Sequence, residues 1–196
     1  MPLTKNTDAT ETAGLNRRNR LIFVSCVLLS LGASAVWGGT SKEQTVFEAA
    51  PYQRIRHPVH LPQDVLQLLA KDNHVSDCMK DNPIPRSGSL ANWFTASEIH
   101  LSKPTEDDLV VLPTAQGHPH LCFHSVEGIG WFWVFRQVGA HYELVLKTAG
   151  LGLTIRDTRH NGYKEIQSGA AFGTHRSETT YRFENGTYRE FRRDAQ

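Results

Sequence analysis

The chain has 196 residues, of which 39% are hydrophobic and 21% are charged, and its formal net charge is +1 at pH 7. This length is typical of a single domain. From Val36 onward, 6 Lys and 11 Arg are balanced by 18 acidic residues. That balance argues against nucleic acid as a partner, because nucleic-acid-binding proteins carry a dense basic surface.

The first 35 residues have the pattern of an export signal. Three arginines between positions 17 and 20 directly precede an apolar run over residues 21–31, and an Ala-Ser-Ala site ends at Ala35. A basic region, an apolar core and a small-residue site define a secretory signal peptide, so we predict cleavage after Ala35. An uncleaved membrane anchor over residues 21–37 is the alternative. In both cases we expect the folded part to lie outside the cytoplasm. With cleavage the protein is periplasmic or secreted, and without it the N-terminal segment is its one contact with a membrane.

The rest of the chain divides into two parts. We predict a flexible tether over residues 36–58 and a single β-rich domain over residues 59–196. The one strong helix pattern is Leu61 to Lys71, where Pro62 suits the first turn and four apolar residues recur at helical spacing, namely Val65, Leu66, Leu68 and Leu69. A turn or second short helix around Val75 to Lys80 should follow it.

Two cysteines remain after the leader, Cys78 and Cys122, and they lie 44 positions apart. Exported proteins fold in an oxidising compartment, where an even number of cysteines favours pairing. We therefore predict one disulfide. From the loss of chain entropy in the unfolded state, it should stabilise the fold by on the order of 4 kcal/mol. Two unpaired buried thiols are the alternative.

From Trp93 onward, short runs of β-branched and aromatic residues alternate with Gly, Asn and Pro, which predicts strands. We predict them over residues 94–101, 108–112, 120–125, 131–137, 141–147, 151–155, 163–167, 179–184 and 187–192. The run 131–137 is apolar on both faces, which indicates a central strand, and Asn185-Gly186 favours a tight hairpin. The expected fold class is mainly β (α+β), an antiparallel meander of about eight to nine strands with one N-terminal helix packed on it.

His118, His120, Cys122 and His124 occur at every second position. In an extended strand they would share one face, and imidazole is a ligand of zinc and copper, so the three histidines form a candidate metal site. The alternative places Cys122 in the disulfide and the histidines on a partly exposed face. Geometry favours this alternative, because same-face residues in a row lie about 6–7 Å apart and do not converge on one ion.

The acidic turn Lys103-Pro-Thr-Glu-Asp-Asp108 precedes the apolar run Leu109-Val-Val111. Over residues 99–111 this segment resembles the calcium loop of FG-GAP or VCBS-type propeller repeats, in which an Asp/Asn/Gly-rich turn precedes such a strand. The resemblance implies Asp108 as a calcium ligand. However, Ser-Lys-Pro at 102–104 stands where the repeats carry Asp and Asn, and the turn glycine is absent, so a solvated acidic turn is the alternative.

The G-x-S-x-G, S-x-x-K and H-E-x-x-H motifs are absent from the sequence, and we predict no catalytic or cofactor-binding residue. If the protein binds zinc, copper or calcium, we expect it to do so at the histidine row or at the acidic turn described above. In size, export and β-richness the chain is similar to small envelope proteins of bacteria, including periplasmic inhibitors of lytic enzymes. This resemblance implies a noncatalytic binding or inhibitor module with a protein or cell-wall partner. A periplasmic hydrolase and a metal-handling protein that uses the histidine row are the alternatives.

Overall fold

The computed structural model describes residues 43–49, 55–84, 88–114, 120–125, 127–172 and 175–195. The predicted signal peptide or membrane anchor and His118 lie outside these residues. Within the described residues, none of the helices is long and apolar enough to cross a membrane.

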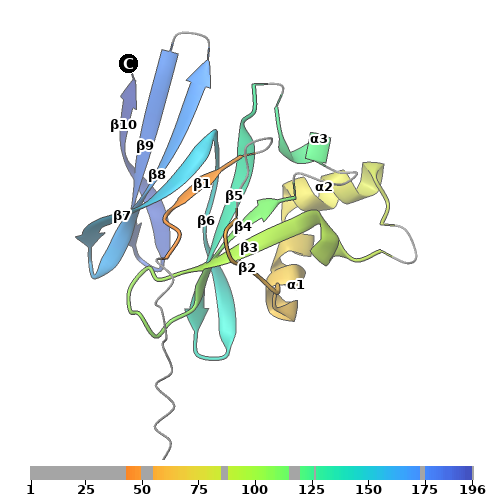
Figure 1. Ribbon diagram of the computed structural model, residues 1–196, viewed down its shortest axis with the longest axis horizontal. Helices are drawn as coiled ribbons and strands as arrows, with labels where there is room; N and C mark the ends of the chain where they lie inside the picture. Colours follow the sequence, from red (N-terminus) through yellow and green to blue (C-terminus); the bar gives the residue numbers. More distant parts are fainter. Residues whose placement is uncertain are drawn as a thin grey trace, which may run out of the picture. The chain divides into compact units, whose positions relative to one another are not determined.

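The described residues form two five-stranded antiparallel sheets, as the mainly β prediction requires (Figure 1). The central sheet has the order β2-β3-β4-β5-β6, with β2 (Pro58–Val59), β3 (Phe94–Ile99), β4 (Asp108–Pro113), β5 (Gly130–Val138) and β6 (His141–Gly150). The outer sheet has the order β1-β7-β8-β9-β10, with β1 (Val46–Glu48), β7 (Gly152–His160), β8 (Tyr163–Phe172), β9 (His175–Glu184) and β10 (Thr187–Ala195). Of the predicted strands, only the run 120–125 is not a strand, since α3 (His120–Phe123) occupies it.

Strand β5 is apolar on both faces because both faces are covered. Phe132 and Val134 are fully buried in the core between the two sheets. Trp133 and Phe135 are fully buried on the opposite face, against the helices. The strand lies between β4 and β6, so the prediction of a strand in the interior of the sheet is confirmed, and the central sheet is the middle of three layers.

Two helices cover the second face of the central sheet, α1 (Gln63–Lys71) and α2 (Asn73–Asp81). One residue, Asp72, separates them. It ends α1 in an extended conformation, and its carboxylate accepts hydrogen bonds from the amides of His74 and Val75, which caps α2. The α2 helix is the second short helix considered for residues 75–80. The helical layer also contains α3 and the short 3-10 helix η1 (Leu90–Trp93), which were not predicted.

The N-terminal part of the described chain belongs to the fold. We predicted a tether over residues 36–58, yet Val46–Glu48 forms β1 and pairs with β7. Phe47 is 1% exposed and lies in the core between the sheets. Burial of one large aromatic side chain stabilises by roughly 2 kcal/mol, which explains why this segment is drawn into the outer sheet.

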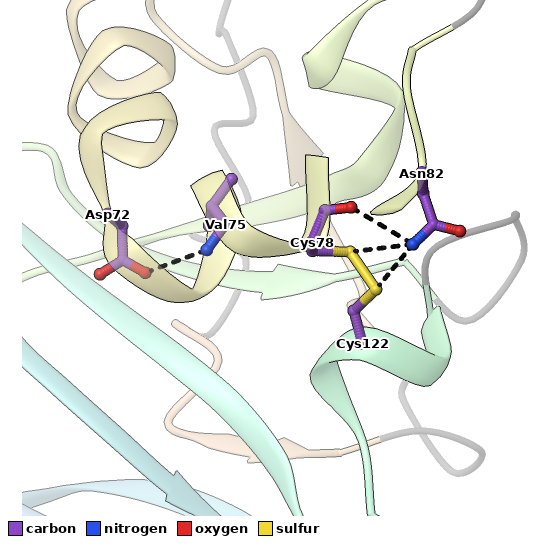
Figure 2. The surroundings of a disulfide bond; sticks show 5 residues. All are labelled: Asp72, Val75, Cys78, Asn82 and Cys122. Atoms are coloured by element: carbon purple, nitrogen blue, oxygen red, sulfur yellow. Dashed lines mark hydrogen bonds between the residues drawn. A yellow bond between two sulfur atoms is a disulfide. The ribbon is translucent and has the colours of Figure 1, made fainter. Parts of the chain in front are cut away.

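The predicted disulfide is present. Cys78 of α2 and Cys122 of α3 are bonded, with 5.8 Å between their Cα atoms. Figure 2 shows that Asn82 follows the helix and directs its side-chain amide at the bridge, where Nδ2 lies 3.2 Å from Cys122 Sγ and also donates to the Cys78 carbonyl. The bridge therefore joins two helices that are far apart in sequence.

The helical conformation of residues 120–123 has a packing reason. Cys122 must reach α2 for the disulfide, while Phe123 is 1% exposed and packs against Phe94 and Trp133. Adjacent residues of a strand point to opposite faces, but a helical turn lets both side chains reach the helical layer. The strand predicted for 120–125 was wrong for this reason.

Candidate ligand-binding site

Three connections between strands border an open pocket of about 420 Å³ at one end of the sheets. We call it the loop-end pocket. It is lined by Thr105 and Glu106 of the β3–β4 connection, residues 136–139 at the end of β5, and Tyr163 at the start of β8. Loops on a rigid scaffold are the usual place for binding residues, and cavities of roughly 300–1,000 Å³ are typical of ligand sites.

The buried carboxylate of Asp108 fixes two walls of this pocket. Its Oδ2 accepts a hydrogen bond from the Leu101 amide at 2.9 Å, and its Oδ1 accepts one from the Gln137 amide at 2.9 Å. Burial raises the pKa of Asp108, although the two amide hydrogen bonds oppose that shift. Asp108 therefore holds the β3–β4 connection to the end of β5.

This arrangement differs from the calcium role that the propeller-like loop implied for Asp108. Both carboxylate oxygens point at backbone amides of the chain itself. Among the described residues, no group of three or more His, Cys, Asp or Glu side chains is arranged to hold a metal ion. In the structure the aspartate of this loop organises the backbone.

Further hydrogen bonds hold the β3–β4 connection to the β5–β6 hairpin. The Asp107 amide donates to Gln137 Oε1 at 2.9 Å, and the Tyr142 hydroxyl donates to the Asp107 carbonyl at 3.0 Å. Within the loop, His100 Nδ1 donates to the Glu106 carbonyl at 3.0 Å. The pocket wall is therefore ordered by the chain's own contacts.

The β7–β8 hairpin holds the same loop from the other side. Arg159 Nη1 lies 2.8 Å from the Ser102 carbonyl and 2.7 Å from the Gly162 carbonyl. Asn161 and Gly162 both have positive φ, at 52° and 82°, which suits the tight turn that presents Tyr163 to the pocket.

Arg136 is the cation of the pocket. Its Nη2 donates to Glu143 Oε2 at 2.6 Å and its Nη1 donates to the Tyr163 hydroxyl at 3.1 Å. The guanidinium lies 5.1 Å from the centre of the Phe183 ring, which stacks on Tyr163. Its Nε is buried and has no hydrogen-bond partner within the described residues, so part of its donor capacity is not used by the described chain.

Glu106 is the anion of the pocket. Its Oε2 accepts a hydrogen bond from the Ser102 hydroxyl at 2.5 Å, and its Oε1 accepts one from Lys103 Nζ at 3.1 Å. The hydrogen bond from Ser102, followed by that from Lys103, lowers the pKa of Glu106, and the charge of Arg136 contributes in the same direction. Glu106 therefore stays ionised at neutral pH, close enough to Arg136 for the two charges to interact.

The side chains of two of the three histidines predicted as ligands fall outside what the structure describes, so the proposed zinc or copper row stays a prediction. His118 lies outside the described residues, and so does the side chain of His120. His124 forms an isolated bridge with Gly130, beyond the helical turn of α3. That turn removes the every-second-residue alternation on which the zinc or copper prediction depended.

The residues of the pocket were not identified from the sequence as a site. Arg136 carried the clearest signal, because it is a charged residue at the end of an otherwise apolar run that begins at Trp131. Glu106 lay within the acidic turn that was considered for calcium. Tyr163 stands far from both in sequence and carried no signal of its own.

Comparisons with protein-family models, with curated proteins and with solved structures find no match to this chain. The functional inference therefore rests on the loop-end pocket and its charges.

Proposed function

We propose that this protein is an exported, noncatalytic binding module of the cell envelope that holds a small polar ligand, or the polar end of a larger one, in the loop-end pocket. The observation that carries the proposal is a pocket of about 420 Å³ whose polar walls are fixed by Asp108. Pre-ordered walls favour binding because little conformational entropy is lost when the ligand enters.

Two features support export. The N-terminal pattern is typical of a signal peptide, and disulfides such as Cys78–Cys122 persist mainly outside the reducing cytoplasm. The partner that fits this location is a protein or the cell wall.

The state of the pocket's charges favours binding over catalysis. A general acid or base works best with a pKa near the operating pH, whereas the pKa of Glu106 is lowered. The His160–Glu184 pair, at 3.7 Å, is a surface contact and does not line the pocket. A hydrolase therefore has less support than a binding module.

The test is binding to isolated cell-wall sacculi. The protein purified after expression of the full chain is sedimented with sacculi, and its inhibition of a muramidase is assayed in parallel. We expect binding or inhibition that falls at least tenfold in Arg136→Gln. Lys80→Gln is the control, because Lys80 forms an exposed surface pair with Asp77 on α2 and should behave as wild type.

Neither sedimentation nor inhibition with the wild-type protein would overturn the cell-wall assignment. Equal activity of wild type and Arg136→Gln would overturn the role of the loop-end pocket.

A further inference from the structure

We infer that the loop-end pocket takes a zwitterion, either a free amino acid or a short peptide with both ends free, whose carboxylate pairs with Arg136 and whose ammonium group pairs with Glu106. The inference rests on the proposed binding function and specifies its ligand. It follows from the donors, the acceptors and the exposure of the charged groups in the pocket.

The Arg136 side of the pocket is rich in donors. A guanidinium offers five N–H groups. Within the described residues Nη1 and Nη2 each donate to one side-chain acceptor, which leaves a second N–H on each of them, while the N–H of Nε is buried and is not among these donors. The Tyr163 hydroxyl accepts from Arg136 and keeps its own proton to donate. Gln137 uses Oε1 for the Asp107 amide, which leaves Nε2 as a donor. A carboxylate matches these donors, because it accepts several hydrogen bonds and pairs with Arg in a bidentate manner.

The Glu106 side requires the opposite charge. Its carboxylate is ionised, and its field would repel a ligand that carried only negative charge. The positive charge of Arg136 acts on Glu106 and contributes to lowering its pKa. A ligand that neutralises both groups at once therefore fits the pocket better than a simple anion or a simple cation.

The present partners of both charges can be exchanged. Glu143 is 53% exposed and Lys103 is 71% exposed, whereas Arg136 and Glu106 are 18% and 28% exposed. Exposed ion pairs contribute little net stability, because water screens them and the long side chains lose freedom in forming them. A ligand carboxylate can therefore replace Glu143, and a ligand ammonium can replace Lys103, with little loss.

The experiment is a titration of the full chain, followed by NMR or calorimetry, with four probes. L-alanine and L-alanyl-L-alanine carry both charges, N-acetyl-L-alanine carries only the carboxylate, and L-alaninamide carries only the ammonium group. We expect at least one zwitterion to bind about tenfold more tightly than either blocked probe, because each blocked probe lacks one charge-assisted pair. The ratio between L-alanine and the dipeptide decides between an amino acid and a peptide.

Four substitutions should change the affinity for a zwitterion in different directions. Arg136→Gln and Glu106→Gln should each weaken zwitterion binding about tenfold. Glu143→Gln and Lys103→Gln remove the competing partners and should leave the affinity equal or higher. A merely structural role for these pairs would instead weaken binding in all four variants. Lys80→Gln again serves as the control.

Three outcomes would overturn the inference: N-acetyl-L-alanine binding as tightly as the zwitterions, full affinity in Glu106→Gln, or no binding of any probe at millimolar concentration. Arg136-dependent binding of sacculi without zwitterion binding would reject the zwitterion and keep the binding module. Zwitterion binding without any effect on sacculi or muramidase would reject the cell-wall partner alone. If Arg136→Gln fails to fold, the substitutions of the exposed Glu143 and Lys103 still test the inference, because a loss of zwitterion affinity in them would contradict it.

Discussion

The helical layer and the loop-end pocket lie on the same central sheet, but different interactions hold them. The helical layer is held by buried aromatic contacts, such as Phe123 against Trp133 at 5.9 Å between ring centres, and by the Cys78–Cys122 bridge. The loop-end pocket is held by hydrogen bonds that converge on Asp108. Packing distributes stability over many residues, whereas the pocket walls are held by a small set of polar contacts in which Asp108 is the buried carboxylate, so mutations should separate stability from binding.

The largest effect on stability should come from the bridge. Replacing Cys78 and Cys122 together by Ala removes the closure of a loop of 44 residues, and we expect the free energy of unfolding to fall by about 2–4 kcal/mol. Urea denaturation measures the change. Reductant should bring the wild-type protein to the same midpoint, while ligand affinity should not change.

Equal urea midpoints for the wild type and the double variant would show that aromatic packing alone holds the helical layer. Loss of ligand binding in the double variant would show that the two regions are coupled, and the comparison between them would fail.

Asp108→Asn should act on the pocket. An amide side chain retains one acceptor but presents an NH₂ group to the second backbone amide, so the amide of Leu101 or Gln137 loses its partner. We expect a loss of about 2 kcal/mol in the free energy of unfolding, with weaker ligand binding. The matched control is Asp107→Asn, because Asp107 is the exposed neighbour whose contacts use only its backbone.

If Asp107→Asn and Asp108→Asn unfold at the same urea concentration, Asp108 does not organise the loops. If Asp108→Asn is destabilised but binds ligand like the wild type, the pocket walls do not need this anchor.

Asp72→Asn tests a largely buried ionic contact of the helical layer. Lys147 Nζ lies 2.8 Å from Asp72 Oδ2, and the two side chains are 19% and 7% exposed. Asn preserves the cap of α2 but removes the charge, so the ammonium group of Lys147 keeps only neutral partners. We expect about 1–2 kcal/mol of destabilisation in urea. Asp77→Asn, in the exposed pair with Lys80, should have no measurable effect.

Destabilisation by Asp77→Asn equal to that by Asp72→Asn would mean that burial does not distinguish the two pairs. The stability of the helical layer would then depend on charge in general.

Much of the sheet could be predicted because its signals are local. Alternation of large apolar residues on both faces of 131–137 predicted β5, and the positive φ values of Asn185 and Gly186, 51° and 86°, are those that the Asn-Gly pair favours in a hairpin. The same pair at Asn161-Gly162 forms the turn before Tyr163. These features depend on neighbours within a few residues of each other.

The two main errors came from contacts between distant residues. The turn of α3 is imposed by a disulfide and by aromatic packing with other elements. The hydrophobic periodicity of the local sequence contains no information about either contact. The pocket is assembled from Glu106 in the β3–β4 connection, Arg136 near the end of β5 and Tyr163 at the start of β8, which share no motif. Pairing of β3 with β4, β4 with β5 and β7 with β8 is needed before these side chains meet.

The smallest effect should be the acid titration of the pocket. Hydrogen bonds from Ser102 and then Lys103 lower the pKa of Glu106, so between the lowered and the ordinary pKa the folded state holds fewer protons than the unfolded state. The stabilisation by Glu106 is therefore present above the ordinary pKa and is lost as the pH falls through the lowered one. Solvent screening limits it to a few tenths of a kcal/mol.

Carbon NMR of the Glu106 carboxyl measures the midpoint directly. We expect a midpoint below that of an ordinary glutamate, a rise in Lys103→Gln, and no change in Lys80→Gln. A midpoint at or above the ordinary value would mean that the Ser102 contact does not form in solution. If the pKa of Glu106 is lowered as expected, binding of an ammonium-bearing ligand should persist in acid down to the pH at which Glu106 becomes protonated. The stability of the disulfide-linked helical layer should not depend on the ionisation of Glu106. If the stability of the helical layer and ligand binding in the loop-end pocket were lost at the same acid pH, the two regions would not be independent. That result would contradict the comparison more directly than a loss of stability in any one variant.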